Sequence, residues 1–244
     1  MNVIGIHNTG ITSSASLLID GKIVYGISEE RITRQKYSKY FPHQSIKRCL
    51  DYCKLKISDI DYFAIGWNPA INIGYRYRAG LSEWQEHAGE RFFSNPNNLL
   101  PTITNNRMMN FTEQKFNYDS SENTKIVYVT HHLAHIANAF YLSKYINAGI
   151  LSFDGYGEKT SMCWALTDKY GIKIVDEIEF PHSLGQFYSA ITEFLGFRPD
   201  FDEWKVMGAS AYGNELKYLD KLNKIIKIKK NNNFELDLSF FNHF

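Results

Sequence analysis

The chain has 244 residues, of which 44% are hydrophobic and 15% aromatic. This length suits one large domain or two of ordinary size, and the composition is sufficient for a packed core. Its 27 basic and 26 acidic side chains leave a net charge of +1. A strong field that would attract nucleic acid or an anionic membrane is therefore excluded, and small-molecule chemistry is favoured.

The start of the chain has neither a basic region nor a long apolar stretch, and no window approaches the roughly 18 apolar residues of a membrane span. We therefore expect a cytoplasmic protein. Cys49, Cys53 and Cys163 have neither a disulfide pattern nor a zinc spacing, so we expect three buried thiols.

Three apolar runs open the chain, at residues 3–8, 14–20 and 22–28. The first run ends in a polar loop that contains Gly10. Asp20-Gly21, between the second and third runs, is typical of a tight hairpin. Helical spacing of apolar residues after Pro42 predicts a helix, and residues 62–67 predict a fourth strand.

The same order of elements begins again near residue 148. Apolar strands are expected over residues 149–153, 161–167 and 172–180, and the first of them ends in Asp154-Gly155-Tyr156-Gly157-Glu158. A helix follows, in which Ser183 and Gln186 form a candidate capping box. Its predicted apolar face consists of Leu184, Phe187, Tyr188, Ile191 and Leu195.

Two units of this kind predict a duplicated α/β fold that clamps a ligand between its halves. We expect a complete first lobe over residues 1–147, with an insertion at about 70–124, and an incomplete second lobe over 148–244. The loops with Gly10, Gly155 and Gly157 could offer backbone N–H groups to phosphate oxygens. Plain hairpins that bind no ligand are the alternative.

The segment that begins at Thr130 is the sharpest motif, because it places three histidines in the first turns of a predicted helix. Thr130 is a good N-cap, and the apolar stripe is expected to consist of Leu133, Ile136, Ala137, Phe140 and Tyr141. At about 100° per residue, His131 and His135 lie about 40° apart on the opposite side of the helix. Two imidazoles at this spacing can converge on one metal ion, whereas two solvated histidines are the alternative.

The position after His131 is occupied by His132, where metalloprotease chemistry would need a glutamate base. A carboxylate ligand must therefore come from elsewhere in the chain. Asp154 is the natural candidate, because it ends a strand and opens a glycine turn. Two histidines and a carboxylate suit Fe(II), Mn(II) or Zn(II) and leave coordination positions open.

Several strings in this sequence resemble the NodU/CmcH carbamoyltransferase family. They occur in the family's order over most of the chain, at Gly5–His7, Ser28–Tyr37, His131–His135, Asp154–Glu158, Ser183–Phe197 and Glu203–Gly213. The resemblance implies an α/β fold with a duplicated actin/hexokinase-like core that holds ATP and a metal, with Fe(II) favoured over Mn(II) or Zn(II). It also implies synthesis of a carbamoyl-adenylate from a carbamoyl phosphate donor and transfer of the carbamoyl group to a hydroxyl acceptor.

The resemblance also implies roles for single residues. His131, His135 and Asp154 match metal ligands, and His7 and Lys36 match residues that line the carbamoyl-adenylate site. In the E-x-K-x-M-G string, Glu203 matches a nucleotide contact, and we place Lys205 and Gly208 beside it. A solvated run of charges is the alternative for Lys36.

Two departures from the family pattern stand out. The rest of the second lobe and the family's YrdC-like domain have no counterpart up to Phe244, and Ala209-Ser210 replaces the usual Leu-Ala. We therefore expect a fragment whose partners are the missing lobe and that domain. A split nucleotide-binding fragment without activity and another phosphotransferase of the same fold, such as a sugar kinase, are the alternatives.

Overall fold

The computed structural model describes residues 1–8, 12–38, 41–67, 125–229 and 233–241. The predicted insertion and Gly10 lie outside these residues. The chain divides into two compact units, Met1–His131 and His132–Phe244. The division falls after the first residue of one continuous helix, α5 (His131–Leu142).

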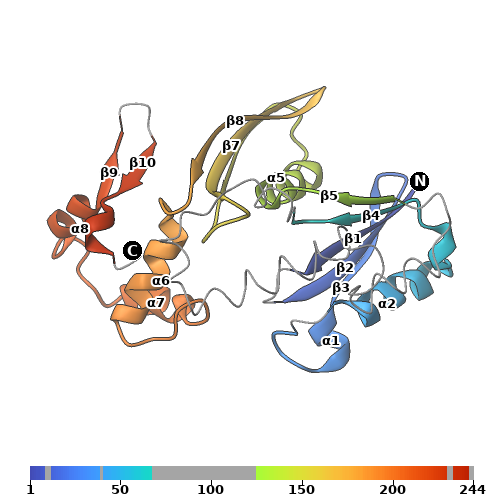
Figure 1. Ribbon diagram of the computed structural model, residues 1–244, viewed down its shortest axis with the longest axis horizontal. Helices are drawn as coiled ribbons and strands as arrows, with labels where there is room; N and C mark the ends of the chain where they lie inside the picture. The colour runs from blue at the N-terminus through green and yellow to red at the C-terminus, as the bar shows by residue number, and fades with distance from the viewer. Residues whose placement is uncertain (9–11, 39–40, 68–124, 230–232, 242–244) are drawn as a thin grey trace, which may run out of the picture. The chain divides into compact units, whose positions relative to one another are not determined.

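The first unit is built on a five-stranded sheet with the order β3-β2-β1-β4-β5 (Figure 1). Its strands are β1 (Asn2–Asn8), β2 (Ser13–Ile19), β3 (Lys22–Ser28), β4 (Tyr62–Ile65) and β5 (Lys125–Tyr128). The first three strands pair antiparallel, whereas β4 runs parallel to both β1 and β5. Asp20 and Gly21 have φ values of 49° and 79°, as a tight hairpin turn of this type requires, which confirms the predicted hairpin.

The core of the first unit lies between this sheet and α2 (His43–Cys53). Every second residue of β1 and β2 is buried, which places Ile4, Ile6 and Leu17 against Ile46 and Cys49 of the helix. A short 3-10 helix, η1 (Ile57–Asp59), leads from this helix back to β4. The helix and the fourth strand occur where the spacing of apolar residues predicts them.

A buried carboxylate joins α2 to the preceding short helix, α1 (Glu29–Thr33). Glu29 is 4% exposed, and its two oxygens accept hydrogen bonds from the backbone N–H groups of Gln44 and Ser45 and from the Ser45 hydroxyl. These groups lie in the first turn of α2, where backbone N–H groups lack partners within the helix. The loop between the two helices, which contains Lys36, is therefore fixed at both ends.

The second unit contains a three-stranded antiparallel sheet with the order β6-β7-β8. Its strands are β6 (Ala148–Phe153), β7 (Thr160–Asp168) and β8 (Gly171–Glu179). Helix α5 lies on this sheet, because Ile136 is fully buried against Cys163 and Ala165 of β7. The predicted lobe boundary after residue 147 remains a prediction, although α5 packs on the sheet that follows it.

The remainder of the second unit consists of short elements. These are α6 (Leu184–Phe194), α7 (Glu203–Ser210), α8 (Leu219–Ile225), β9 (Ile226–Ile228), β10 (Phe234–Leu236) and the 3-10 helix η4 (Leu238–Phe240). Phe234 and Leu236 are buried against Ile178 and α6. The strands β9 and β10 pair antiparallel as a hairpin that packs on the unit.

Each unit contains three consecutive antiparallel strands, β1 to β3 in the first and β6 to β8 in the second, and a helix follows the third. This repeat confirms the predicted α/β class and its duplicated core. None of the helices in the described part of the chain has the length and apolar character needed to cross a membrane.

Four predictions about burial need correction. Tyr141, Tyr188 and Leu195 are 71%, 39% and 52% exposed, so none of them belongs to a buried helix face. Cys49 and Cys163 are buried as expected, whereas Cys53 is only partly buried. Burial raises the pKa of both the Cys49 and the Cys163 thiol to about 11, so these two thiols stay protonated and inert.

Candidate metal centre

The first turns of α5 present two histidines toward a common point. His131 and His135 are one helical turn apart, and the side chain of His135 is 53% exposed. Asp154 follows the last residue of β6 and has a side chain that is 44% exposed. One ligand atom from each of these three residues lies within 4.8 Å of the other two.

This convergence matches the sequence-based expectation for His131, His135 and Asp154. Metal–ligand bonds of about 2.0–2.2 Å place neighbouring ligand atoms roughly 3–3.5 Å apart, so small side-chain rotations would bring the three groups onto one ion. His135 Nε2 is already 3.5 Å from Asp154 Oδ2. The donor set of two imidazoles and one carboxylate is one that Fe(II), Mn(II) and Zn(II) accept.

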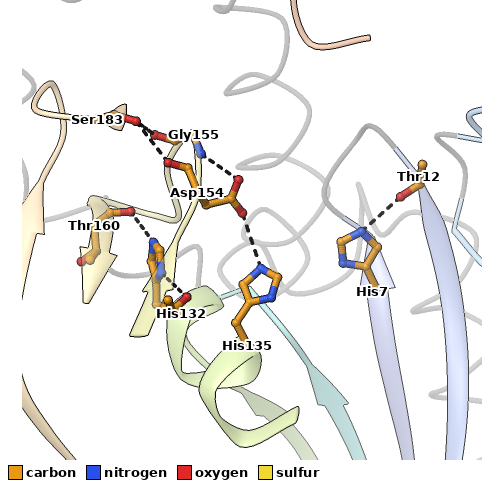
Figure 2. Close-up of polar contacts among 9 residues, drawn as sticks. His7, Thr12, His132, His135, Asp154, Gly155, Thr160 and Ser183 are labelled. Carbon is orange, nitrogen blue, oxygen red and sulfur yellow. Dashed lines mark hydrogen bonds and ion pairs between the residues drawn. The ribbon is translucent and has the colours of Figure 1, made fainter. Parts of the chain in front are cut away.

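Asp154 is oriented by its own loop (Figure 2). Its Oδ1 atom accepts a 2.7 Å hydrogen bond from the Gly155 N–H, while Oδ2 faces His135. Hydrogen bonding to Asp154 raises the pKa of the His135 imidazole above its usual value, and burial opposes this shift. The Asp154 carboxylate therefore stabilises positive charge beside it, either a proton on His135 or a bound cation in place of that proton.

His132 is a residue that the sequence analysis did not assign to the site. It is 3% exposed, and its ring nitrogens Nδ1 and Nε2 lie 2.8 Å from Ser152 Oγ and from the Thr160 carbonyl oxygen, respectively. Its spacing from Ile136 could have indicated this burial, because residues four apart lie on the same helix face.

A second buried contact holds the Asp154 loop from the side of α6. Ser183, the N-cap of that helix, is fully buried and donates to the carbonyl oxygens of Asp154 and Gly155 at 3.1 and 2.5 Å. Its hydroxyl oxygen also accepts from the Gln186 N–H at 3.1 Å, which confirms one half of the predicted capping box.

Gly185 allows this close approach between helix and loop. A Cβ atom at Gly185 would lie 2.6 Å from backbone atoms of Asp154 and Gly155, a distance that real side chains do not reach. Position 185, where the start of α6 touches the Asp154 loop, therefore requires a glycine.

The predicted phosphate contacts of this loop are engaged within the chain. The N–H of Gly155 donates to Asp154, and the N–H of Gly157 donates to the Thr160 carbonyl oxygen at 2.6 Å. Either group would have to exchange its partner to bind a phosphate, so the roles of Gly155 and Gly157 stay predictions. Glu158, in the same loop, is 5% exposed.

The predicted nucleotide contacts lie on α7, which is joined to α6 by a hydrogen bond. Glu203 Oε1 accepts from Ser189 Oγ of α6 at 2.8 Å and from the Asp200 N–H at 2.6 Å. Lys205 pairs with Asp202 at 2.8 Å, and open space surrounds Gly208. Glu203 is therefore held by the same helix that supports the Asp154 loop.

In the first unit, three aromatic side chains follow the carboxyl ends of parallel strands. His7 is the second-last residue of β1, Trp67 follows β4 and His131 follows β5, so all three lie at one edge of the sheet. The rings of Trp67 and His131 are 5.4 Å apart in an edge-on arrangement. Ligands of open α/β sheets bind at edges of this kind.

Two polar groups at this edge suit a bound ligand. His7 Nε2 lies 3.3 Å from the Thr12 hydroxyl (Figure 2). Trp67 is 9% exposed, and its indole N–H has no hydrogen-bond partner among the residues that the structure describes. A buried donor without a partner is costly, so a ligand oxygen there would relieve that cost.

Lys36 lies in the loop between α1 and α2 and is exposed. The neighbouring backbone is fixed, because the Tyr37 N–H donates to Glu30 at 3.2 Å and the Ser38 carbonyl accepts from the buried Ser13 hydroxyl at 3.2 Å. Lys36 is thus an exposed cation on an anchored loop, and its catalytic role stays a prediction.

The comparisons with known proteins show the family of this chain. Residues 2–244 match the profile of the family described as Carbamoyltransferase N-terminus. Protein sll1178 of Synechocystis is 30% identical over 99% of this chain and 40% of its own length. Nodulation protein NolNO of Sinorhizobium fredii is 28% identical over 97% of this chain and 33% of its own length.

Among solved structures, YeaZ from Pseudomonas aeruginosa is similar with a TM-score of 0.40 and 13% identity, covering 74% of this chain and 68% of YeaZ. The activator of 2-hydroxyisocaproyl-CoA dehydratase from Clostridium difficile gives a TM-score of 0.39 and 11% identity, covering 95% of this chain and 78% of that protein.

The molecule is thus an α/β protein with a duplicated core and a cluster of two histidines and an aspartate at a strand end. The chain belongs to the carbamoyltransferase N-terminus family. It spans well under half the length of the two curated relatives described above.

Proposed function

We propose that this chain forms the metal-binding and nucleotide-binding part of an ATP-dependent O-carbamoyltransferase. The observation on which the proposal depends is the convergence of His131, His135 and Asp154, whose ligand atoms lie within 4.8 Å of one another. Family membership supports carbamoyl transfer as the reaction class.

The donor set fits a divalent metal, with Fe(II) as the first candidate and Mn(II) or Zn(II) as alternatives. Such an ion supplies positive charge that stabilises phosphate oxygens during reaction. The chain's own residues orient the three ligands. Asp154 is oriented by the Gly155 N–H, and α5 holds both imidazoles on one face. Trp67 adds a buried donor for a ligand oxygen at the edge of the first sheet.

The reaction proposed has two steps. In the first, a carbamate oxygen attacks the α-phosphorus of ATP, a carbamoyl-adenylate forms, and pyrophosphate leaves. In the second, an acceptor hydroxyl attacks the carbamoyl carbon and AMP leaves. His7 is assigned to take the proton of that hydroxyl, and Lys36 to neutralise phosphate charge.

The nucleotide side of the proposal assigns Glu203 to the ribose, with Lys205 and Gly208 beside it. Glu203 is pre-oriented by Ser189 and by the Asp200 N–H, which fix Oε1 and leave Oε2 without a hydrogen bond to the described residues. A carboxylate held in this way is suited to accept a ribose hydroxyl.

The test is a titration with ATP in the presence of Mn(II), monitored by calorimetry. We expect His135→Ala to weaken ATP binding by about tenfold or more, because a metal-linked contact is lost. Asp220→Asn, a change on the exposed surface of α8, is the control and should bind like the wild type. Equal ATP affinity in all three proteins would contradict the proposal.

The products distinguish carbamoyl transfer from kinase chemistry. With ATP and ammonium carbamate, which bypasses a separate donor domain, the proposal predicts AMP and pyrophosphate. Accumulation of ADP instead would indicate a phosphotransferase of the same fold.

A further inference from the structure

The buried histidine between the two candidate ligands in the sequence, His132, has no role in the proposed chemistry, although both of its ring nitrogens have hydrogen-bond partners. His132 is rotated about 100° from His131 and about 60° from His135 around α5, and it is 3% exposed. Its two ring nitrogens each have a partner at 2.8 Å, one on β6 and the other on β7 (Figure 2).

These partners determine how the ring is protonated. The Thr160 carbonyl oxygen can only accept a hydrogen bond, so Nε2 carries a hydrogen. In the neutral ring, Nδ1 is then an acceptor, and the Ser152 hydroxyl donates to it. Both nitrogens are satisfied, which is the condition under which a buried polar group fixes one arrangement of its neighbours.

The partners also lie close to the third candidate ligand. Ser152 lies on β6, two residues before Asp154, and Thr160 follows the loop that Asp154 opens. Asp154 N–H in turn donates to the Ser161 carbonyl oxygen at 2.9 Å, which closes that loop. His132 therefore ties the helix with two candidate ligands to the strand and loop that present the third.

We infer that His132 is a positioning residue that sets the spacing between the histidine pair and Asp154, and thereby determines metal affinity. The inference rests on the proposed metal site. Packing contacts alone leave more freedom, because α5 is otherwise held on the sheet mainly by one fully buried side chain, Ile136, among the described residues. A helix held by an apolar contact can slide or rotate slightly, whereas two directed hydrogen bonds fix both its height and its rotation.

The experiment compares Co(II) binding, followed by the visible spectrum, with thermal stability in matched variants. His132→Ala removes both hydrogen bonds, and Ser152→Ala removes one of them with a smaller structural change. Ile136→Val is the control, because it weakens the packing of the same helix without changing its polar contacts. His132→Gln tests rescue, because its side-chain amide can still donate to the Thr160 carbonyl.

We expect His132→Ala to weaken Co(II) binding by about 10–100-fold and to alter the spectrum, the range seen when groups that orient metal ligands are removed. The Co(II) affinity of Ser152→Ala should lie between those of His132→Ala and the wild type. His132→Gln should recover part of the affinity that His132→Ala loses. Ile136→Val should lower the melting temperature and leave the affinity within about twofold, because the polar contacts remain.

The inference is overturned if the wild type binds Co(II) and both His132→Ala and Ser152→Ala bind it equally well with the same spectrum. It is also overturned if Ile136→Val weakens binding as much as His132→Ala, because stability alone would then explain the loss. If the wild type binds no Co(II), the proposed metal site fails and the inference fails with it.

Discussion

Gly185 is the single residue whose replacement tests the local geometry of the Asp154 loop most sharply. Two effects oppose each other when a helical glycine becomes alanine. The helix gains about 1 kcal/mol in propensity, whereas a Cβ atom 2.6 Å from the Asp154 backbone must push the loop and the helix apart. Overpacking of this kind typically costs about 1–3 kcal/mol, so the clash should exceed the gain.

We therefore expect Gly185→Ala to lower the free energy of unfolding, measured in urea. Gly208→Ala is the matched control, because Gly208 is also helical and a Cβ atom there would meet nothing within 4 Å. That change should stabilise the protein by up to about 1 kcal/mol. If both substitutions stabilise the protein, the close contact between α6 and the Asp154 loop does not exist in solution.

At the residue scale, the sequence predicted the members of the cluster but not the residues that hold them. His131 and His135 follow from helical spacing, and Asp154 from its place at a strand end. Ser152 and Ser183 could not be found in this way, because their contacts depend on how β6, β7 and α6 meet. The Trp67 N–H, which has no hydrogen-bond partner among the described residues, likewise has no signature in the sequence.

At the scale of elements, the hairpin of β9 and β10 is attached to the rest of its unit through a histidine. The Leu236 N–H donates to His182 Nδ1 at 3.1 Å, which requires that nitrogen to be unprotonated. Burial lowers the pKa of His182 below its usual value of 6.5, and Lys229 adds to this effect while Glu235 opposes it. Both the hydrogen bond and the lowered pKa therefore indicate that the folded protein favours the neutral form of His182.

A lowered pKa in the folded state means that the unfolded chain binds the proton more tightly. The second unit should therefore be most stable above pH 6.5 and lose stability as the pH falls through 6.5 and on to the lower folded-state pKa of His182. His182→Asn keeps an acceptor for Leu236 and does not titrate. Urea unfolding of both proteins from pH 7.5 to about 5 should show a steeper loss of the free energy of unfolding in the wild type. Parallel curves of this free energy against pH would refute the role of His182.

Strands were easier to predict than short helices. The alternation of buried residues in β1 and β2, and the turns at Asp20-Gly21 and Gly171, identify the two sets of three strands directly. The end of α5 was mispredicted because apolar spacing continues to Tyr141, although the sheet buries only the start of the helix. The pairing of β9 with β10 was missed because strands of three residues show too little periodicity.

At the scale of the whole molecule, the two units share one architectural repeat without sharing the same residues. The first unit uses its parallel strands to bring His7, Trp67 and His131 to one sheet edge. The second unit uses a loop between β6 and β7 to present Asp154. The duplication could be predicted because strand order and turn chemistry are local properties, whereas the placement of the units depends on contacts that the sequence does not specify.

The central claim is that His131, His135 and Asp154 hold one divalent metal ion. Its most direct test is elemental analysis of the purified chain after equilibration with Fe(II), Mn(II) or Zn(II) and removal of loosely bound ions. His131→Ala, His135→Ala and Asp154→Ala are compared with the wild type, and His43→Ala, a histidine of α2, serves as the control.

We predict about one ion per chain in the wild type and in His43→Ala, and a large loss in each of the other three variants, because removing one of three ligands leaves too few bonds to retain the ion. A wild type without bound metal, or three variants that retain as much metal as the wild type, would contradict the account.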